Sequence, residues 1–271
     1  MADRIALNLA TIKQASLEAA LAIAEQVGYA GVGLWVNEIE QARQRRVTLR
    51  DIAADLAGRG LEAAELCFVA GWMYADRPER QRALAAAKDA FRTAEFLTCG
   101  CVAACASTAL GDLRTAAEDF AALCDRARPF GVRCALEFIG GAEQVNDIQT
   151  ASEIVRLAGR DNGGLLLDTF HFYKGGSSLA QLREVPAEQI FLVHLSDSLD
   201  LPRSELADRH RVFPGMGVAP LPEIIGTLHQ RGYQGYYSLE LFNEGYWESD
   251  AFIVARDGLR ALTRVGLKIE D

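Results

Sequence analysis

The chain has no apolar run long enough to span a membrane, which argues against a transmembrane helix. No signal peptide is expected, because the first residues, MADRIALNLA, lead directly into a strand-like pattern. Basic residues are in the minority, with 28 Lys and Arg against 37 Asp and Glu and a net charge of −9. Since phosphate backbones bind to basic surfaces, this balance argues against nucleic acid as a partner. We therefore expect a cytoplasmic protein that binds neither membranes nor nucleic acid.

The chain also lacks paired cysteines and linker segments. None of its six cysteines forms a CxxC pair, and all lie among apolar or small residues, as is typical of buried free thiols in a reducing compartment. No stretch with the composition of a linker divides the 271 residues, half of which are hydrophobic. One domain over residues 1–271, with a large core, is therefore expected.

Predicted strands and helices alternate along the whole chain, with glycine repeatedly placed between the end of a helix and the next strand. Ser16 and Thr48 are predicted N-caps, Gly28 follows the first helix, and Asp51 is placed to complete a capping box with Thr48. The expected strands are residues 5–9, 31–36, 61–69, 101–107, 134–139, 164–168, 190–197 and 237–242, and the expected helices are residues 16–27, 48–60, 79–97, 113–129, 147–158, 179–182, 221–230 and 250–265. Eight such pairs in a chain of this length predict an α/β fold, a single (β/α)8 TIM barrel.

Four of these strands carry an ionisable residue close to their carboxyl ends, namely Glu137, Asp168, His194 and Glu240. A buried strand has no packing reason to hold such a residue, and in a barrel the carboxyl ends of all strands meet at one mouth. Two glutamates, an aspartate and a histidine form a hard-to-borderline ligand set that suits Mn, Mg, Co or Zn. The pattern therefore predicts a site for one divalent metal ion.

The segment of residues 198–220 lengthens the interval between the last two of these positions. It carries Asp208, Arg209, His210 and Arg211 and then a turn at residues 214–217. Loops of this length without structure of their own are often functional. We interpret the segment as a lid or a lining of the barrel mouth.

Five motifs resemble those of the xylose-isomerase-like superfamily of TIM barrels, also described as AP-endonuclease-2-like. They are ALEFIG at residues 135–140, RDNGGLLLDTFHF at 160–172, IFLVHLSDS at 190–198, RVFPGMG at 211–217 and YYSLELFNEGYW at 236–247. Within the superfamily they are most similar to those of the inosose (2-keto-myo-inositol) isomerases of myo-inositol catabolism. The detailed resemblance covers residues 131–247, residues 6–11 match loosely, and residues 35–76 match in pattern only.

The resemblance implies roles for individual residues. It places metal ligation on Glu137, Asp168, His194 and Glu240, and an acid/base pair on the two glutamates. It further implies that His171 holds a substrate oxygen, and Arg211 occupies the position of an arginine that precedes the Pro-Gly turn. Both would donate hydrogen bonds to substrate oxygens.

Aromatic residues supply a candidate apolar wall for a sugar ring, with core packing and a subunit contact as alternatives. They are Trp35, Phe68, Trp72, Phe170 and Trp247.

The implied activity is the isomerisation or epimerisation of an inosose or related keto sugar, by proton transfer through a metal-stabilised enediolate. A dehydratase of the inosose or dehydroshikimate type would use the same ligands, so this alternative stays open. An endonuclease IV-like nuclease needs a multi-zinc cluster and is disfavoured by the acidic charge and by a total of four histidines. A further alternative is a non-enzymatic barrel in which the four ligands form only a structural metal site. It is disfavoured because the site has more carboxylates than a structural site needs. Fold-level analogy also allows a homodimer.

Overall fold

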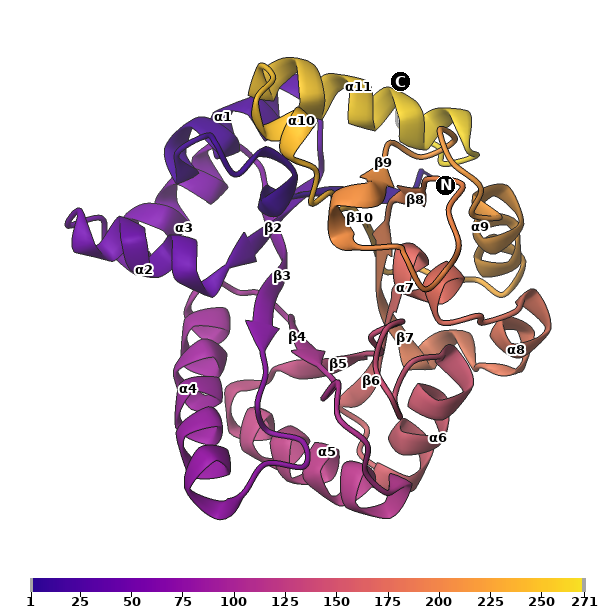
Figure 1. Cartoon of the computed structure of the whole chain (residues 1–271). Coiled ribbons are helices and arrows are strands. Elements are labelled where there is room, and N and C mark those ends of the chain that lie inside the picture. Colours follow the sequence, from indigo (N-terminus) through magenta and orange to yellow (C-terminus); the bar gives the residue numbers. More distant parts are fainter. Residues whose placement is uncertain (1, 270–271) are drawn as a thin grey trace.

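The computed structural model describes residues 2–269 and shows eight parallel strands closed into a barrel, with helices around it (Figure 1). Around the barrel the strands follow the order β1, β2, β3, β4, β5, β6, β7 and β10, and β10 pairs with β1 to close it. The predicted TIM barrel is therefore confirmed. The barrel strands are β1 Arg4–Asn8, β2 Gly31–Trp35, β3 Glu62–Val69, β4 Cys101–Cys105, β5 Arg133–Glu137, β6 Gly163–Asp168, β7 Ile190–Leu195 and β10 Tyr236–Leu239.

The helices lie outside the strands, and their ends follow the capping signals of the sequence. Ser16 caps the first helix by accepting a hydrogen bond from the backbone of Ala19, and Gly28 ends that helix with a φ of 98°. Thr48 and Asp51 form the predicted capping box. The helices are α1 Leu17–Val27, α2 Val36–Gln44, α3 Leu49–Gly58, α4 Arg77–Phe96, α5 Leu113–Ala127, α6 Ile148–Ala158, α7 Thr169–Lys174, α8 Leu179–Glu184, α9 Leu221–Gln230, α10 Glu244–Trp247 and α11 Ala251–Arg264.

The core has two parts because each strand alternates its side chains between the barrel interior and the helices. The larger part lies between the strands and helices and is built from leucine, isoleucine, valine and phenylalanine. The interior part is rich in small residues, including Ala6, Ala64, Ala103 and Ala135. All six cysteines are unpaired, as predicted, and five of them are buried. Among residues 2–269, no helix combines the length and the apolar character needed to cross a bilayer.

Three helices were not predicted, namely α2, α7 and the short α10. Residues Val36–Gln44 form α2 without a side-chain cap at its start, so the sequence carried no start signal for it. Residues Thr169–Lys174 form α7, which begins directly after β6 because Asp168 accepts a hydrogen bond from the backbone of His171 at 2.8 Å. This turn places His171 on the first turn of a helix at the barrel mouth.

The expected loop at residues 198–220 is partly ordered as an antiparallel pair of short strands, β8 Asp197–Ser198 and β9 Arg211–Val212. The buried carboxylate of Asp197 accepts hydrogen bonds from the backbone N–H groups of Gly215, Gly217 and Ala219, at 2.9 to 3.0 Å. A Cβ on Gly217 would lie only 2.1 Å from the Ser198 carbonyl oxygen, so the close approach requires glycine. These contacts fix the segment that carries Arg211.

Candidate metal centre and active site

The structure brings all four predicted metal ligands together at the carboxyl end of the barrel. One ligand atom from each of Glu137, Asp168, His194 and Glu240 lies within 4.8 Å of the other three. Nδ1 of His194 lies 3.2 Å from Oε2 of Glu240, 3.9 Å from Oε1 of Glu137 and 4.0 Å from Oδ2 of Asp168. All four side chains are buried.

The parallel register of the barrel sets these residues at one level. Asp168 on β6 pairs with His194 on β7, and Glu137 is the last residue of β5. Glu240 directly follows β10, whose Ser238 pairs with His194. The four residues therefore meet at the carboxyl ends of the strands, as the sequence predicted. Active sites of TIM barrels lie at this end.

The residues present fit a divalent metal ion. Nδ1 of His194 is buried and has no hydrogen-bond partner, although it faces three carboxylates. Three acidic groups this close together repel one another unless a cation lies among them. One imidazole nitrogen and three carboxylate oxygens suit zinc, manganese, cobalt or magnesium.

The electrostatic environment perturbs each of these groups. Burial, together with the neighbouring Glu240 and Asp168, raises the pKa of Glu137 to about 8. Burial also acts to raise the pKa of Asp168, but the Arg211 guanidinium outweighs it and holds that pKa well below its usual range. Burial acts to lower the pKa of His194, yet Glu240 and other carboxylates raise it well above its ordinary value. Such perturbation is typical of a functional site.

His171 and Arg211 lie beside the ligands. Nη1 of Arg211 is 2.7 Å from Oδ2 of Asp168 and 3.2 Å from the hydroxyl of Ser196, and Nη2 is 3.5 Å from Nε2 of His171. Burial lowers the pKa of His171 to about 4, so its imidazole is neutral near pH 7. Its Nδ1 has no hydrogen-bond partner. Both side chains line the cavity at the barrel mouth.

That cavity has a volume of about 130 Å³ and is lined by three of the metal ligands, His171, Arg211 and an aromatic wall. Trp35 forms the wall with Phe68 and Phe242, whose ring centroids lie 5.5 and 5.6 Å away.

Three of the predicted aromatic residues do not line this cavity. Trp72 is fully buried against Phe120, with 5.8 Å between the ring centroids, so it belongs to the core. Phe170 lies beneath the Arg211 guanidinium, and Trp247 donates a hydrogen bond to the carbonyl of Ala10.

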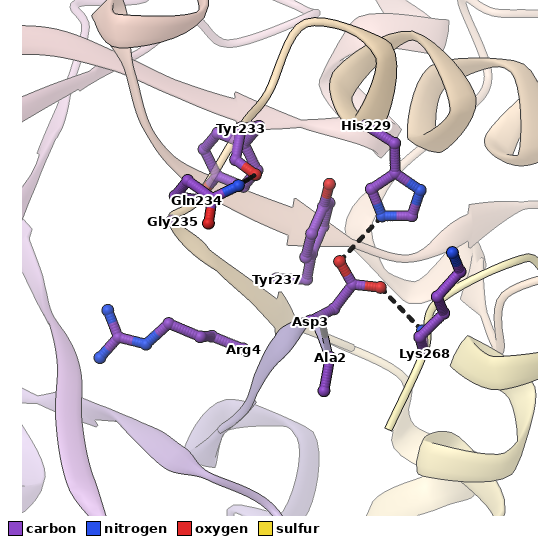
Figure 2. A pocket seen from close by; sticks show the side chains of 9 residues that line it. All are labelled: Ala2, Asp3, Arg4, His229, Tyr233, Gln234, Gly235, Tyr237 and Lys268. Atoms are coloured by element: carbon purple, nitrogen blue, oxygen red, sulfur yellow. Dashed lines mark hydrogen bonds and ion pairs between the residues drawn. The ribbon is translucent and has the colours of Figure 1, made fainter. Parts of the chain in front are cut away.

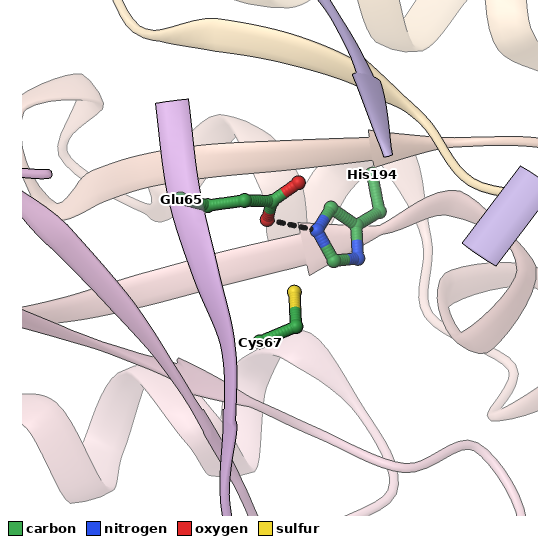
Figure 3. Close-up of side chains that lie close together, drawn as sticks. All are labelled: Glu65, Cys67 and His194. Carbon is green, nitrogen blue, oxygen red and sulfur yellow. Dashed lines mark hydrogen bonds and ion pairs between the residues drawn. The ribbon is translucent and has the colours of Figure 1, made fainter. Parts of the chain in front are cut away.

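Several polar residues at the centre were not predicted. Glu65 of β3 is fully buried with Oε2 2.5 Å from Nε2 of His194, and Cys67 lies beside them (Figure 3). Cys105 donates its thiol hydrogen to Oε2 of Glu137 at 2.9 Å, and Asn8 donates to Oε1 of Glu240 at 3.2 Å. The one available signal was the acidic residue inside the apolar run AELCF.

A larger cavity, of about 430 Å³, lies at the opposite end of the barrel (Figure 2). It is lined by residues at the amino ends of β1 and β10, including Asp3, Arg4 and Tyr237. Asp3 contacts His229 there at 2.8 Å. None of the predicted site residues lies in it.

Known proteins resemble this chain in sequence and in fold. The sequence profile described as xylose isomerase-like TIM barrel matches residues 21–265. The inosose isomerase of Halalkalibacterium halodurans is 42% identical over 130 residues, which cover 48% of this chain and 46% of that protein. The chain thus matches about half the length of the curated inosose isomerases. The 3-dehydroshikimate dehydratase of Pseudomonas aeruginosa is 31% identical over 240 residues, which cover 87% of this chain and 37% of that protein.

The fold is shared with a solved structure that holds a metal. The crystal structure of an IOLI protein with a binding zinc atom superposes with a TM-score of 0.92 at 26% sequence identity, and the match covers 97% of each chain. The profile covers most of the chain, and the barrel is the one that the profile describes. The protein therefore belongs to the xylose isomerase-like TIM barrel family.

Proposed function

We propose that this protein is a divalent-metal-dependent isomerase or epimerase of an inosose or a related keto sugar. The observation that carries the proposal is the convergence of Glu137 and Glu240 with Asp168 and His194 on one cavity. The similarity to inosose isomerases supports the substrate class. A cytoplasmic location and a small-molecule substrate belong to the same proposal, and so does a homodimer.

The four ligands would hold one divalent ion, which when bound polarises the carbonyl and the adjacent hydroxyl of the substrate. The two glutamates would then move the proton. One carboxylate removes the hydrogen from the carbinol carbon next to the carbonyl, which leaves an enediolate. A carboxylic acid then returns a proton to the neighbouring carbon while the proton of the former hydroxyl passes to the former carbonyl oxygen, which moves the carbonyl. Returned instead to the opposite face of the same carbon, the proton inverts that centre.

Each glutamate directs one carboxylate oxygen toward the metal centre, and its other oxygen accepts a hydrogen bond from a neighbouring side chain. Glu137 turns Oε1 toward His194 and receives the Cys105 thiol on Oε2. Glu240 turns Oε2 toward His194 and receives the Asn8 amide on Oε1. Such fixed orientations favour proton transfer along one path.

His171 and Arg211 would bind substrate oxygens, and Trp35 would cover an apolar face of the ring. The guanidinium lies in a buried position where it can stabilise negative charge that develops on an oxygen. The unpartnered Nδ1 of His171 provides a further polar contact.

A dehydratase activity is the second candidate, because the dehydroshikimate dehydratase match extends over 87% of the chain. The same enolate would then expel a β-hydroxyl group as water.

Proton NMR of 2-keto-myo-inositol in D₂O distinguishes these activities. The protein is stripped of metal and then reconstituted with Mn²⁺, which is removed before spectra are recorded. Metal-dependent deuterium uptake beside the carbonyl with a new inosose identifies the isomerase, and an unsaturated product identifies the dehydratase. No change in either sample rejects this substrate.

A further inference from the structure

One buried carboxylate at the centre has no part in the proposed proton transfer. Glu65 on β3 is 0% exposed and lies behind the ligand His194, on the side away from the other three ligands. Figure 3 shows its carboxylate and the Cys67 thiol directed toward the imidazole. A buried charge of this kind is costly unless every lone pair is used.

Both oxygens of Glu65 are used. Oε1 accepts hydrogen bonds from the Ser238 hydroxyl at 2.6 Å and from the Asn8 amide at 3.1 Å, and Oε2 contacts Nε2 of His194 at 2.5 Å. The neighbouring strand makes room for this carboxylate, because a Cβ on Gly33 would lie 2.2 Å from Oε1. The packing therefore holds the carboxylate in one place.

This arrangement decides which nitrogen of His194 carries the proton. A carboxylate that already accepts two hydrogen bonds acts only as an acceptor, so Nε2 must donate to it. When a metal ion binds at the four ligands it displaces the other ring proton, and the neutral imidazole then keeps a single N–H group, which leaves the lone pair on Nδ1 for the ion. Nδ1 is the nitrogen that faces Glu137, Asp168 and Glu240 and has no hydrogen-bond partner.

A second metal ion among Glu65, Cys67 and His194 is the competing interpretation, since their ligand atoms also lie within 4.8 Å of one another. The Asn8 amide argues against it, because Nδ2 donates to Glu65 and lies 3.5 Å from the Cys67 sulfur. Amide and hydroxyl hydrogens point into this cluster and would repel a cation. The cluster is built to orient a ligand.

We propose that Glu65 is a positioning residue for the metal centre, which holds His194 in the Nε2–H tautomer and directs Nδ1 toward the ion. The inference rests on the metal site of the proposed function but not on the identity of the substrate. Asn8 extends the same network, because Nδ2 also donates to Glu240, and its Oδ1 accepts the Trp35 indole N–H at 2.7 Å. One network from β1, β2 and β3 thus orients two of the four ligands.

The tautomer can be observed directly in the wild-type protein loaded with zinc. Long-range proton–nitrogen NMR resolves the two ring nitrogens of each histidine, and four histidines make the spectrum simple to assign. We expect His194 to show a protonated Nε2 and a zinc-bound Nδ1. A zinc-bound Nε2, or a proton on Nδ1, would overturn the proposal.

The role of Glu65 is tested by zinc affinity, measured in competition with a chromophoric chelator. Loss of such a partner weakens metal binding by about 10–100-fold, and we expect this for Glu65→Gln. Glu62→Gln is the matched control, because Glu62 lies on the same strand, is exposed, and loses the same charge. The zinc affinity of Glu62→Gln should equal that of the wild type. Equal affinities for the wild type, Glu65→Gln and Glu62→Gln would overturn the role of Glu65.

If Glu65→Gln does not fold, Ser238→Ala replaces it, since this change removes one donor to Glu65 and leaves every charge in place. A several-fold weaker zinc affinity supports the proposal, and an unchanged affinity contradicts it. A wild-type protein that binds zinc but converts no inosose rejects the proposed substrate and leaves this inference intact. A wild-type protein that binds no divalent ion overturns both.

Discussion

Arg211 gives a quantitative test of how the centre is stabilised, through the substitution Arg211→Met. The guanidinium is 2% exposed and lies 2.7 Å from Asp168 and 3.6 Å from Glu240. Methionine fills a similar volume without charge, so Asp168 would keep a buried carboxylate that has lost its nearest cation. Breaking a buried pair in this way costs about 3–5 kcal/mol, and we expect that loss in the metal-free protein.

Thermal unfolding followed by circular dichroism in EDTA measures this loss. For a domain of this size, about 3–5 kcal/mol corresponds to a fall in Tm of roughly 6–20 °C. Arg211→Lys should lie between the wild type and the methionine variant, because one ammonium cannot contact both Asp168 and Asp208 as the guanidinium does. Arg209→Met is the matched control: its side chain is exposed, so Tm should change by no more than about 2 °C.

Zinc provides a second readout on the same variant. An ion at the four ligands returns to Asp168 the positive charge that methionine removed, so zinc should raise the Tm of Arg211→Met more than that of the wild type. A Tm of Arg211→Met in EDTA within about 2 °C of the wild type would refute the stabilising role of the Arg211–Asp168 pair.

Three further predictions concern proton transfer, pH and the aromatic wall. Glu137→Gln and Glu240→Gln should each lower the rate of deuterium exchange by about 10²–10⁴-fold, and full exchange in both variants would contradict the acid/base assignment. In EDTA, the free energy of unfolding should fall between pH 6.5 and 8, because burial raises the pKa of Glu137 to about 8 and the folded state therefore binds more protons than the unfolded state. One such proton makes the free energy of unfolding fall by about 1.4 kcal/mol per pH unit. The dependence on pH should be shallower in Glu137→Gln. Equal slopes for the two proteins, measured by urea unfolding at several pH values, would argue against a raised pKa of Glu137. Trp35→Phe keeps an aromatic ring in the wall but removes the N–H group that donates to Asn8, so kcat/KM should fall about fivefold. Trp247→Phe is the control and should leave kcat/KM unchanged. Equal effects of the two substitutions in steady-state kinetics would contradict the role of Trp35.

The four ligands were predictable from the sequence because each lies in a local pattern. An apolar run that ends in an ionisable residue indicates a strand end, and the barrel brings successive strand ends together. The predicted caps at Ser16 and Thr48 were confirmed for the same reason, since they depend on neighbouring residues only. Local patterns therefore sufficed for the fold and for the ligand set.

The support behind the ligands was not predictable in this way. Glu65 and His194 are 129 positions apart in the sequence, and they meet only across the barrel interior. The start of α7 was missed because Asp168 combines two roles, as a predicted ligand and as the N-cap that turns the chain into a helix. Periodicity identifies which face of a strand is buried, but it does not say which residue on a distant strand lies opposite.

The formal charges at the centre connect the metal ion with the proposed chemistry. Glu65, Glu137, Asp168 and Glu240 contribute −4, and Arg211 contributes +1, while His194 adds nothing once it is the neutral ligand of a metal ion. The sum of −4 + 1 is −3, and a divalent ion at the four ligands would leave −1. One proton shared between the two glutamates then makes the centre neutral, which is favourable in a buried site. Isomerisation and epimerisation of a neutral sugar both conserve this proton, because a proton removed by one carboxylate is returned by a carboxylic acid. The Glu65 charge therefore helps to set the number of protons available for transfer, in addition to orienting His194.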